Sequence, residues 1–237
     1  MSSQPRHHQF HERLRELEEQ TLGGLDLVTQ QLDRTLQALD DRDIELAVMV
    51  IADDDRLDGR YLEVHQGILS LLATQTPIAG DLRMVAALLH AIRCIERMGD
   101  QCVDIAKLIP PSGYETPQDE QLLEAIEQMG RLVRRQVALA KQAFGTRSVE
   151  LALDVGSLDA EVDQLNREVF RRAVEIGDDL ELREWAMFMI LVARALERIG
   201  DNAVDIAQQA VFVVKGLFHE YGRARGQASR ETGSPDA

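Results

Sequence analysis

One short segment of this chain occurs twice, and that duplication limits the folds that the sequence can adopt. The first copy begins at Arg93 and the second at Arg194, an offset of 101 residues. Nine of the fourteen aligned positions are identical, and no gap is needed. Average composition predicts about one identity in such an alignment. We therefore interpret the chain as two halves built on one plan.

Each copy carries three carboxylates spaced four residues apart, which we call an acidic row. In a helix, successive members of such a series are rotated by about 40°, so all three lie on one side. The rows are Glu96, Asp100 and Asp104 in the first copy, and Glu197, Asp201 and Asp205 in the second.

Two interpretations of the rows compete. In one, the carboxylates form a solvated helix face, because Arg93, Arg97 and Gln101 fall on the same side and offset their charge. In the other, the rows bind hard cations, since carboxylate oxygens are the ligands that Mg, Mn, Ca and Fe prefer. Like charges four residues apart destabilise a helix by about 0.2–0.5 kcal/mol per pair. That cost recurs in both halves, yet spacing alone leaves both interpretations open.

Apolar residues recur every three or four positions through six long segments, which predicts an all-α protein. Three helices, short turns and the same again predict two tandem antiparallel three-helix bundles related by the internal repeat. The start signals are Asp43, Thr76-Pro77, Thr116-Pro117, Ser148 and Asp178-Asp179. The expected helices cover about residues 6–39, 43–74, 76–109, 116–144, 148–176 and 179–218, with stops at Pro110-Pro111 and Gly145.

The Pro/Gly-rich stretch 110–117 is expected to separate the two halves. The predicted parts are a first bundle at 1–110, a second at 111–222, and a disordered tail at 223–237 without aromatic residues. Gly99 and Gly200 lie mid-helix at equivalent positions, where each costs roughly 1 kcal/mol relative to alanine. Their equivalence predicts close approach of a neighbouring helix.

A second group of carboxylates is predicted on the helix before each row, facing that row. We call this group the acidic wall of each half. Asp54 and Asp58 form an i,i+4 pair that faces the first row or, alternatively, a surface balanced by arginines. Asp159 stands 101 residues after Asp58, whereas Val155 stands 101 residues after Asp54. We therefore expect a thinner wall and weaker metal binding in the second half, with Asp159 and Asp163 forming a pair one turn later.

Charge and cysteine content restrict the function classes. A formal net charge of −15 argues against binding nucleic acid or an anionic membrane by simple electrostatics. No run of 18 apolar residues occurs, so we expect no membrane insertion and a cytoplasmic protein. Cys94 and Cys102 are eight residues apart on one predicted helix, about 12 Å in rise, which is too far for a disulfide.

The common catalytic motifs are missing from the sequence. There is no Gly-x-Ser-x-Gly, no P-loop and no glycine-rich dinucleotide motif. A ferritin-like di-metal bundle needs Glu-x-x-His, but Leu62 and Ala87 stand three residues before His65 and His90. We therefore expect a protein that acts by binding and is not an enzyme.

The segments Glu96-Arg97-Met98-Gly99-Asp100 and Glu197-Arg198-Ile199-Gly200-Asp201, each followed two residues later by Val-Asp-Ile-Ala, resemble the PhoU family. Its members are phosphate-transport system accessory proteins. Residues 71–83 are also similar to the family's junction between its second and third helices. The match covers about residues 10–218.

This resemblance implies multinuclear clusters of Fe, Mn, Mg or Zn, bound by the Glu/Asp-x-x-x-Asp rows. Carried over residue by residue, the ligands are Glu96, Asp100, Asp104, Glu197, Asp201 and Asp205, with Asp54, Asp58 and Asp159 as additional candidates.

The resemblance also implies negative regulation of the phosphate-starvation response. The implied partners are the ATPase subunit of a phosphate ABC transporter, a sensor histidine kinase and further copies of the chain. The competing hypothesis is a structural or interaction bundle with solvated acidic faces and no metal.

Overall fold

The structure is a computed structural model that describes residues 4–74, 76–112 and 117–216. Across these residues the chain forms helices and no strand, which confirms the all-α prediction. The helices are α1 (Gln4–Asp40), α2 (Ile44–Ala52), α3 (Asp55–Thr74), α4 (Ala79–Ser112), α5 (Glu120–Thr146), α6 (Val149–Glu175) and α7 (Leu180–Lys215).

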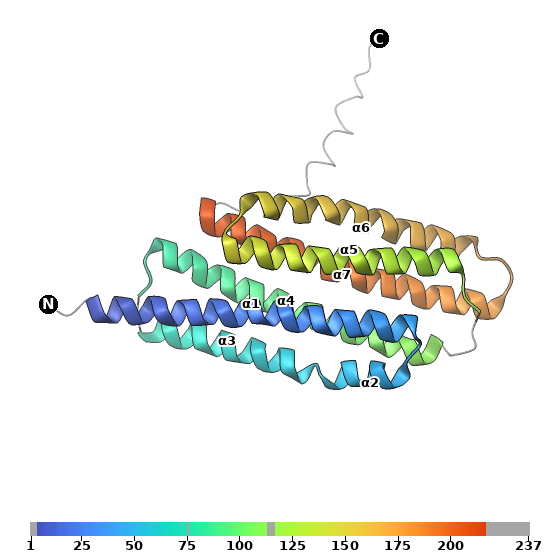
Figure 1. The fold of residues 1–237 in the computed structure, drawn as a ribbon, viewed down its shortest axis with the longest axis horizontal. Coiled ribbons are helices and arrows are strands. Elements are labelled where there is room, and N and C mark those ends of the chain that lie inside the picture. The colour runs from blue at the N-terminus through green and yellow to red at the C-terminus, as the bar shows by residue number, and fades with distance from the viewer. Residues whose placement is uncertain (1–3, 75, 113–116, 217–237) are drawn as a thin grey trace, which may run out of the picture.

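The helices form two three-helix bundles that lie side by side along the same direction (Figure 1). The first bundle contains α1, the α2–α3 pair and α4, and the second contains α5, α6 and α7. The bundles meet where α1 packs on α5 and where α4 packs along α7. One apolar core continues through both bundles, and the predicted tandem architecture is confirmed.

The repeated segments bury the same face in both halves. Ile95 and Met98 on α4, and Leu196 and Ile199 on α7, are fully buried. Apolar positions at this helical spacing form a continuous stripe, so each segment packs one face inward and leaves its acidic row at the stripe's edge.

Three predicted helix starts are confirmed by their caps. The side chains of Asp43, Ser148 and Asp179 each accept a hydrogen bond from the backbone N–H three residues further on. The two Thr-Pro signals are wrong by a few residues, because α4 begins at Ala79 and α5 at Glu120.

At the start of α5, Asp119 is the cap instead of Thr116, which lies outside the described residues. The Asp119 carboxylate accepts from Leu122 N at 3.0 Å and pairs with Arg172 on α6 at 2.6 Å. This charged pair lowers the pKa of Asp119, and the backbone bonds add to that effect. An ionised aspartate with both partners is a stronger start than a Thr-Pro pair.

Two predicted helix ends also differ from the structure. Helix α5 continues through Gly145 to Thr146, and Arg147 takes the left-handed conformation with φ 58°. Arg147 is held there by Glu18 at 2.6 Å. Helix α4 continues through Pro110-Pro111 to Ser112 instead of ending before the two prolines.

The segment that we expected to form one helix over 43–74 is broken at Asp53-Asp54. The Asp53 N–H bonds to Met49 O at 3.0 Å and ends α2, while the Asp54 carbonyl accepts from Leu57 N at 2.9 Å and opens α3. Aspartates favour such helix ends over helix interiors, so three in a row at Asp53–Asp55 were the signal. The corresponding α6 is unbroken.

The remaining sequence predictions about domains fall partly outside the structure. The boundary at 110–117 includes residues that are not described, and the tail at 223–237 lies wholly beyond them. The end of the last helix was expected at Phe218, but α7 ends at Lys215 with Gly216 as its left-handed cap, φ 72°. Among the described helices, none is long and apolar enough to cross a membrane.

The close approach predicted at the two mid-helix glycines is confirmed. A Cβ added at Gly99 would lie 2.6 Å from Leu57 Cδ1, and one added at Gly200 would lie 2.7 Å from Gln136 Oε1. Real Cβ atoms essentially never come this close to a neighbour. These glycines therefore let α3 and α5 pack directly against the backbones of α4 and α7.

We expect Gly99→Ala and Gly200→Ala each to lower the free energy of unfolding by about 1–2 kcal/mol, because overpacking outweighs the helix-propensity gain of alanine. Gly156→Ala on α6 is the matched control, since nothing lies within 4 Å of its added Cβ. That control is expected to stabilise by about 0.5–1 kcal/mol. Urea unfolding measures all three, and equal stabilisation at all three positions would contradict the packing argument.

Candidate metal centres

The acidic rows lie where the buried faces of α4 and α7 meet solvent. Glu96 and Glu197 are half-buried, and the later members of each row are exposed or half-buried. The Glu96 carboxylate pairs with Arg93 at 3.0 Å, and Glu197 pairs with Arg194 in the same way. The first member of each row is therefore half-buried and has an arginine partner, and the first row becomes exposed toward its end, whereas Asp205 at the end of the second row is half-buried again.

In the first bundle, Asp54 and Asp58 add carboxylates from the α2–α3 junction. Asp54 Oδ1 would lie 3.2 Å from a Cβ on Gly99, so it sits against the backbone of the row. Burial raises the pKa of Asp54, and the charges of Asp58 and Asp100 raise it further. We define acidic cluster 1 as Asp54, Asp58, Glu96, Asp100 and Asp104.

The second bundle contains a matching group. Burial, then the charges of Asp159 and Glu197, raise the pKa of Asp201 to about 6. Burial and the charge of Asp163 likewise raise the pKa of Asp159. We define acidic cluster 2 as Asp159, Asp163, Glu197, Asp201 and Asp205.

The expectation of a thinner second wall is wrong, because Asp159 and not Val155 is the counterpart of Asp54. Both aspartates lie eleven residues after a helix cap, Asp43 in one half and Ser148 in the other. Val155 is fully buried in the core. Asp163, which the sequence analysis left out of the ligand set, is the counterpart of Asp58.

The offset of 101 residues pairs Asp54 with Val155, because the first half has four more residues than the second between its acidic wall and its acidic row. These residues lengthen α3 by about one turn of 3.6 residues, which keeps the same helix face inward. An offset of 101 therefore aligns the rows but misaligns the walls. Counting from the helix caps would have found the correct pairs.

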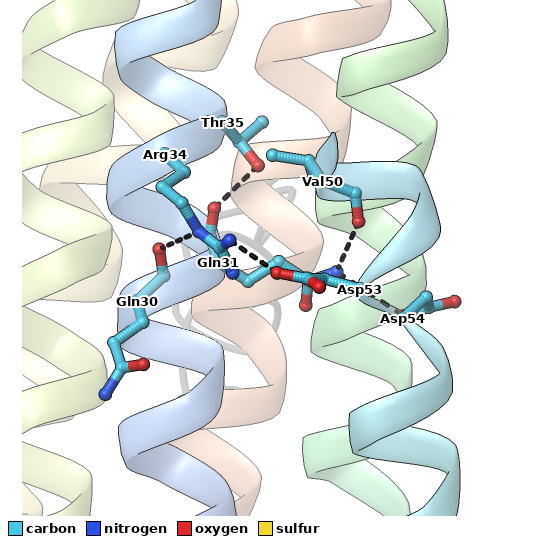
Figure 2. Close-up of polar contacts among 7 residues, drawn as sticks. All are labelled: Gln30, Gln31, Arg34, Thr35, Val50, Asp53 and Asp54. Carbon is cyan, nitrogen blue, oxygen red and sulfur yellow. Dashed lines mark hydrogen bonds and ion pairs between the residues drawn. The ribbon is translucent and has the colours of Figure 1, made fainter. Parts of the chain in front are cut away.

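Two buried glutamines, which the sequence analysis missed, hold the walls in place. Gln31 on α1 donates to Asp54 Oδ1 at 3.4 Å and to the Val50 carbonyl at 3.5 Å, as Figure 2 shows. Gln136 on α5 donates to Asp159 Oδ1 at 3.3 Å. The sequence held no pattern for them, since each is a single glutamine on a mostly apolar helix face and its partner lies on another helix.

The Val50 carbonyl belongs to the end of α2, where helix carbonyls lack an intrahelical partner. Figure 2 also shows Arg34, one turn from Gln31, paired with Asp53, the residue that ends α2. Side chains of α1 thus satisfy the polar groups that the break leaves. These contacts fix Asp54 against α4.

The donor set of each cluster consists of five carboxylates. Such an all-oxygen set fits hard cations. Glu96 Oε2, Gln31 Oε1 and Gln136 Oε1 are buried without a hydrogen-bond partner among the described residues. Three unsatisfied oxygens beside the clusters are the acceptors that a cation or its bound water would satisfy.

The carboxylates of a cluster do not converge as they stand. Within the described part of the chain, no three of them bring oxygen atoms within 4.8 Å of one another. Neighbouring carboxylates repel, and several already have other partners: Glu96 and Glu197 pair with arginines, while Asp54 and Asp159 accept from glutamines. Cation binding would require some of these side chains to change rotamer.

Both cysteines are free, as their spacing predicts. Burial raises the pKa of Cys94 to about 12 and the pKa of Cys102 to about 12. The two thiols are therefore protonated at neutral pH.

Comparison with known proteins shows one family. The PhoU domain model matches residues 24–109 and again 126–210. The chain is 29% identical over 210 residues to the "Phosphate-specific transport system accessory protein PhoU homolog" of Clostridium acetobutylicum, covering 87% of this chain and 94% of the relative. It is 32% identical to the protein of that name from Caulobacter vibrioides, covering 82% and 84%.

Solved structures agree with the sequence matches. The phosphate transport system regulatory protein PhoU from Streptococcus pneumoniae superposes with a TM-score of 0.81 at 27% identity, covering 89% of this chain and 99% of that one. PhoU from Pseudomonas aeruginosa gives a TM-score of 0.79 at 28% identity, covering 88% and 100%.

The raised pKa of Asp201 predicts a pH-dependent stability in chelator-treated protein. The folded-state pKa of about 6 exceeds the ordinary 3.8, so the folded state holds its proton more tightly than the unfolded chain. This contribution is complete below about pH 4 and is lost as the pH rises through about 6. We expect Tm to fall between pH 5 and pH 7, and Asp201→Asn to reduce that fall.

Asp154→Asn serves as the control, because Asp154 is an exposed aspartate on α6 outside both clusters. Thermal unfolding at a series of pH values measures the difference. Since the carboxylates are partly in solvent, added salt should shrink the effect. If Tm falls with pH in Asp201→Asn as steeply as in the wild type, the raised pKa of Asp201 does not cause the loss of stability.

Proposed function

This chain belongs to the PhoU family, and on that premise we propose that it is an accessory protein of a phosphate-specific transport system that represses the phosphate-starvation response. In this proposal it binds the ATPase subunit of a phosphate ABC transporter and a sensor histidine kinase, and holds the kinase in its repressing state while phosphate is plentiful. Relatives at about 30% identity are named as accessory or regulatory proteins of this system, which supports the coarser part of the proposal.

The observation that carries the proposal is the pair of matched acidic clusters on one rigid helical scaffold. Long helices packed around a shared core offer fixed surfaces for partners, and the charge of −15 favours partners with basic patches. The family's named relatives are accessory or regulatory proteins and not enzymes, so we propose function by binding without turnover.

We further propose that both clusters bind metal ions, with Fe, Mn, Mg and Zn as the candidate identities. Cluster 1 would use Asp54, Asp58, Glu96, Asp100 and Asp104, and cluster 2 its five counterparts. A bound cation would neutralise repulsion among the carboxylates and stiffen the helix surface that partners contact. Because Asp159 replaces Asp54 in the second half, the two clusters should bind with comparable strength.

A metal-content measurement tests this part. In protein purified without chelator, we expect Glu96→Gln/Asp100→Asn to lose the metal of cluster 1 and to keep that of cluster 2. Glu197→Gln/Asp201→Asn should show the opposite, with a loss of similar size, because the donor sets are equivalent. Elemental analysis of both double variants and the wild type gives the answer, and unchanged metal in both variants would refute the proposal.

Deletion of the gene tests the signalling role. We expect phosphate-starvation genes to become constitutive in phosphate-rich medium, and the wild-type chain to restore repression. The two double variants, compared at equal protein level, then report whether the clusters are needed for signalling. Normal repression in the deletion strain would show that the signalling role is wrong for this protein.

The alternative is an interaction bundle whose acidic faces are solvated and bind no metal. The arginine pairs at Glu96 and Glu197 favour it, because they already supply a counter-charge to each row. Under this alternative, both double variants keep repression and carry as little metal as the wild type.

A further inference from the structure

Three different kinds of potential metal ligand meet where α4 packs along α7. They are His90 and Cys94 on α4 and Asp205 on α7, and their ligand atoms all lie within 4.8 Å of one another. His90 Nε2 is 4.0 Å from Asp205 Oδ2. Among the side chains that the structure describes, this is the one such group of three.

The group is built across the joint between the two bundles. His90 and Cys94 are four residues apart, so they lie on the same side of α4, as paired zinc ligands on a helix do. Asp205 comes from the other bundle. The packing of α4 on α7 therefore sets the position of Asp205 relative to His90 and Cys94.

Exposure differs among the three side chains in a way that suits ion entry. Cys94 is 1% exposed, so its sulphur forms the floor of the group. The side chains of His90 and Asp205 are both 48% exposed and form its rim. An ion would therefore approach the sulphur from the solvent side, between the half-exposed side chains of His90 and Asp205.

We propose that His90, Cys94 and Asp205 bind one zinc ion that joins α4 to α7, with water as the fourth ligand. Zinc–ligand bonds of about 2.0–2.3 Å in a tetrahedron place neighbouring ligand atoms about 3.5 Å apart. The observed group needs to contract only slightly to reach that geometry. Cys94 binds as a thiolate, and its proton passes to solvent as the zinc–sulphur bond forms.

Ligand chemistry separates this site from the acidic clusters. Thiolate and imidazole favour zinc and cobalt, whereas the all-oxygen clusters favour harder cations. Asp205 belongs to both groups. The proposal does not depend on the signalling role, since it concerns the interface between α4 and α7 within one chain.

The internal repeat supplies a natural comparison. Residues equivalent to His90 and Cys94 in the second half are Leu191 and Ala195, and the equivalent of Asp205 is Asp104. The related position therefore lacks nitrogen and sulphur ligands. It also indicates that leucine and alanine are tolerated at these places in the fold.

Cobalt binding to the full chain, stripped of metal with a chelator, tests the site. We expect one equivalent of Co²⁺ to produce a thiolate-to-cobalt charge-transfer band in the near ultraviolet, and Zn²⁺ to remove it by displacement. Cys94→Ala should abolish the band. His90→Leu should weaken Co²⁺ binding at least tenfold, while both variants keep the helical fold because the second half carries these residues.

Two controls separate this site from others. Cys102→Ala removes the second buried thiol and should leave the band intact. Glu197→Gln/Asp201→Asn disables cluster 2 but keeps Asp205, and it should also leave the band intact. The proposal is overturned if the wild type gives no band, if Cys94→Ala keeps it, or if the cluster 2 variant loses it. An ordinary His–Asp ion pair above a core thiol would give the first of these results.

Discussion

The contact between a mid-helix glycine and a buried glutamine is the constraint on which each acidic cluster depends. At Gly200, the amide of Gln136 occupies the place where any other residue would put its Cβ. The same amide holds Asp159, so helix spacing and carboxylate position are decided together. At Gly99, Leu57, Asp54 and Gln31 fill the corresponding space. Without the glycines, the neighbouring helices would stand further from the rows.

This packing brings together charges that oppose folding. Burial and mutual repulsion raise the pKa of several cluster carboxylates, most clearly Asp201. The apolar core that runs through both bundles must offset this repulsion in the absence of a cation. Repeating such an arrangement in both halves is easier to understand if the clusters bind something, which is the physical basis of the proposed metal sites.

The two halves share a plan but differ in detail. The first half breaks its second helix at Asp53-Asp54 and uses Gln31 and Arg34 to satisfy the break, whereas α6 runs through unbroken. Helix α3 is also about one turn longer than its counterpart. His90 and Cys94 replace Leu191 and Ala195 at the joint of the bundles. The repeat is thus a scaffold on which each half has acquired its own polar contacts.

The sequence by itself determined the helical architecture, the duplicated rows and the caps at Asp43, Ser148 and Asp179. These features depend on hydrogen bonds and side-chain spacing within four residues, which a sequence displays directly. Only the tertiary structure decided that Asp159 pairs with Asp54, that Gln31 and Gln136 hold the walls, and that Asp205 meets His90 and Cys94. Those contacts join helices far apart in the chain, and an extra helical turn shifts their numbering without changing the face that packs inward.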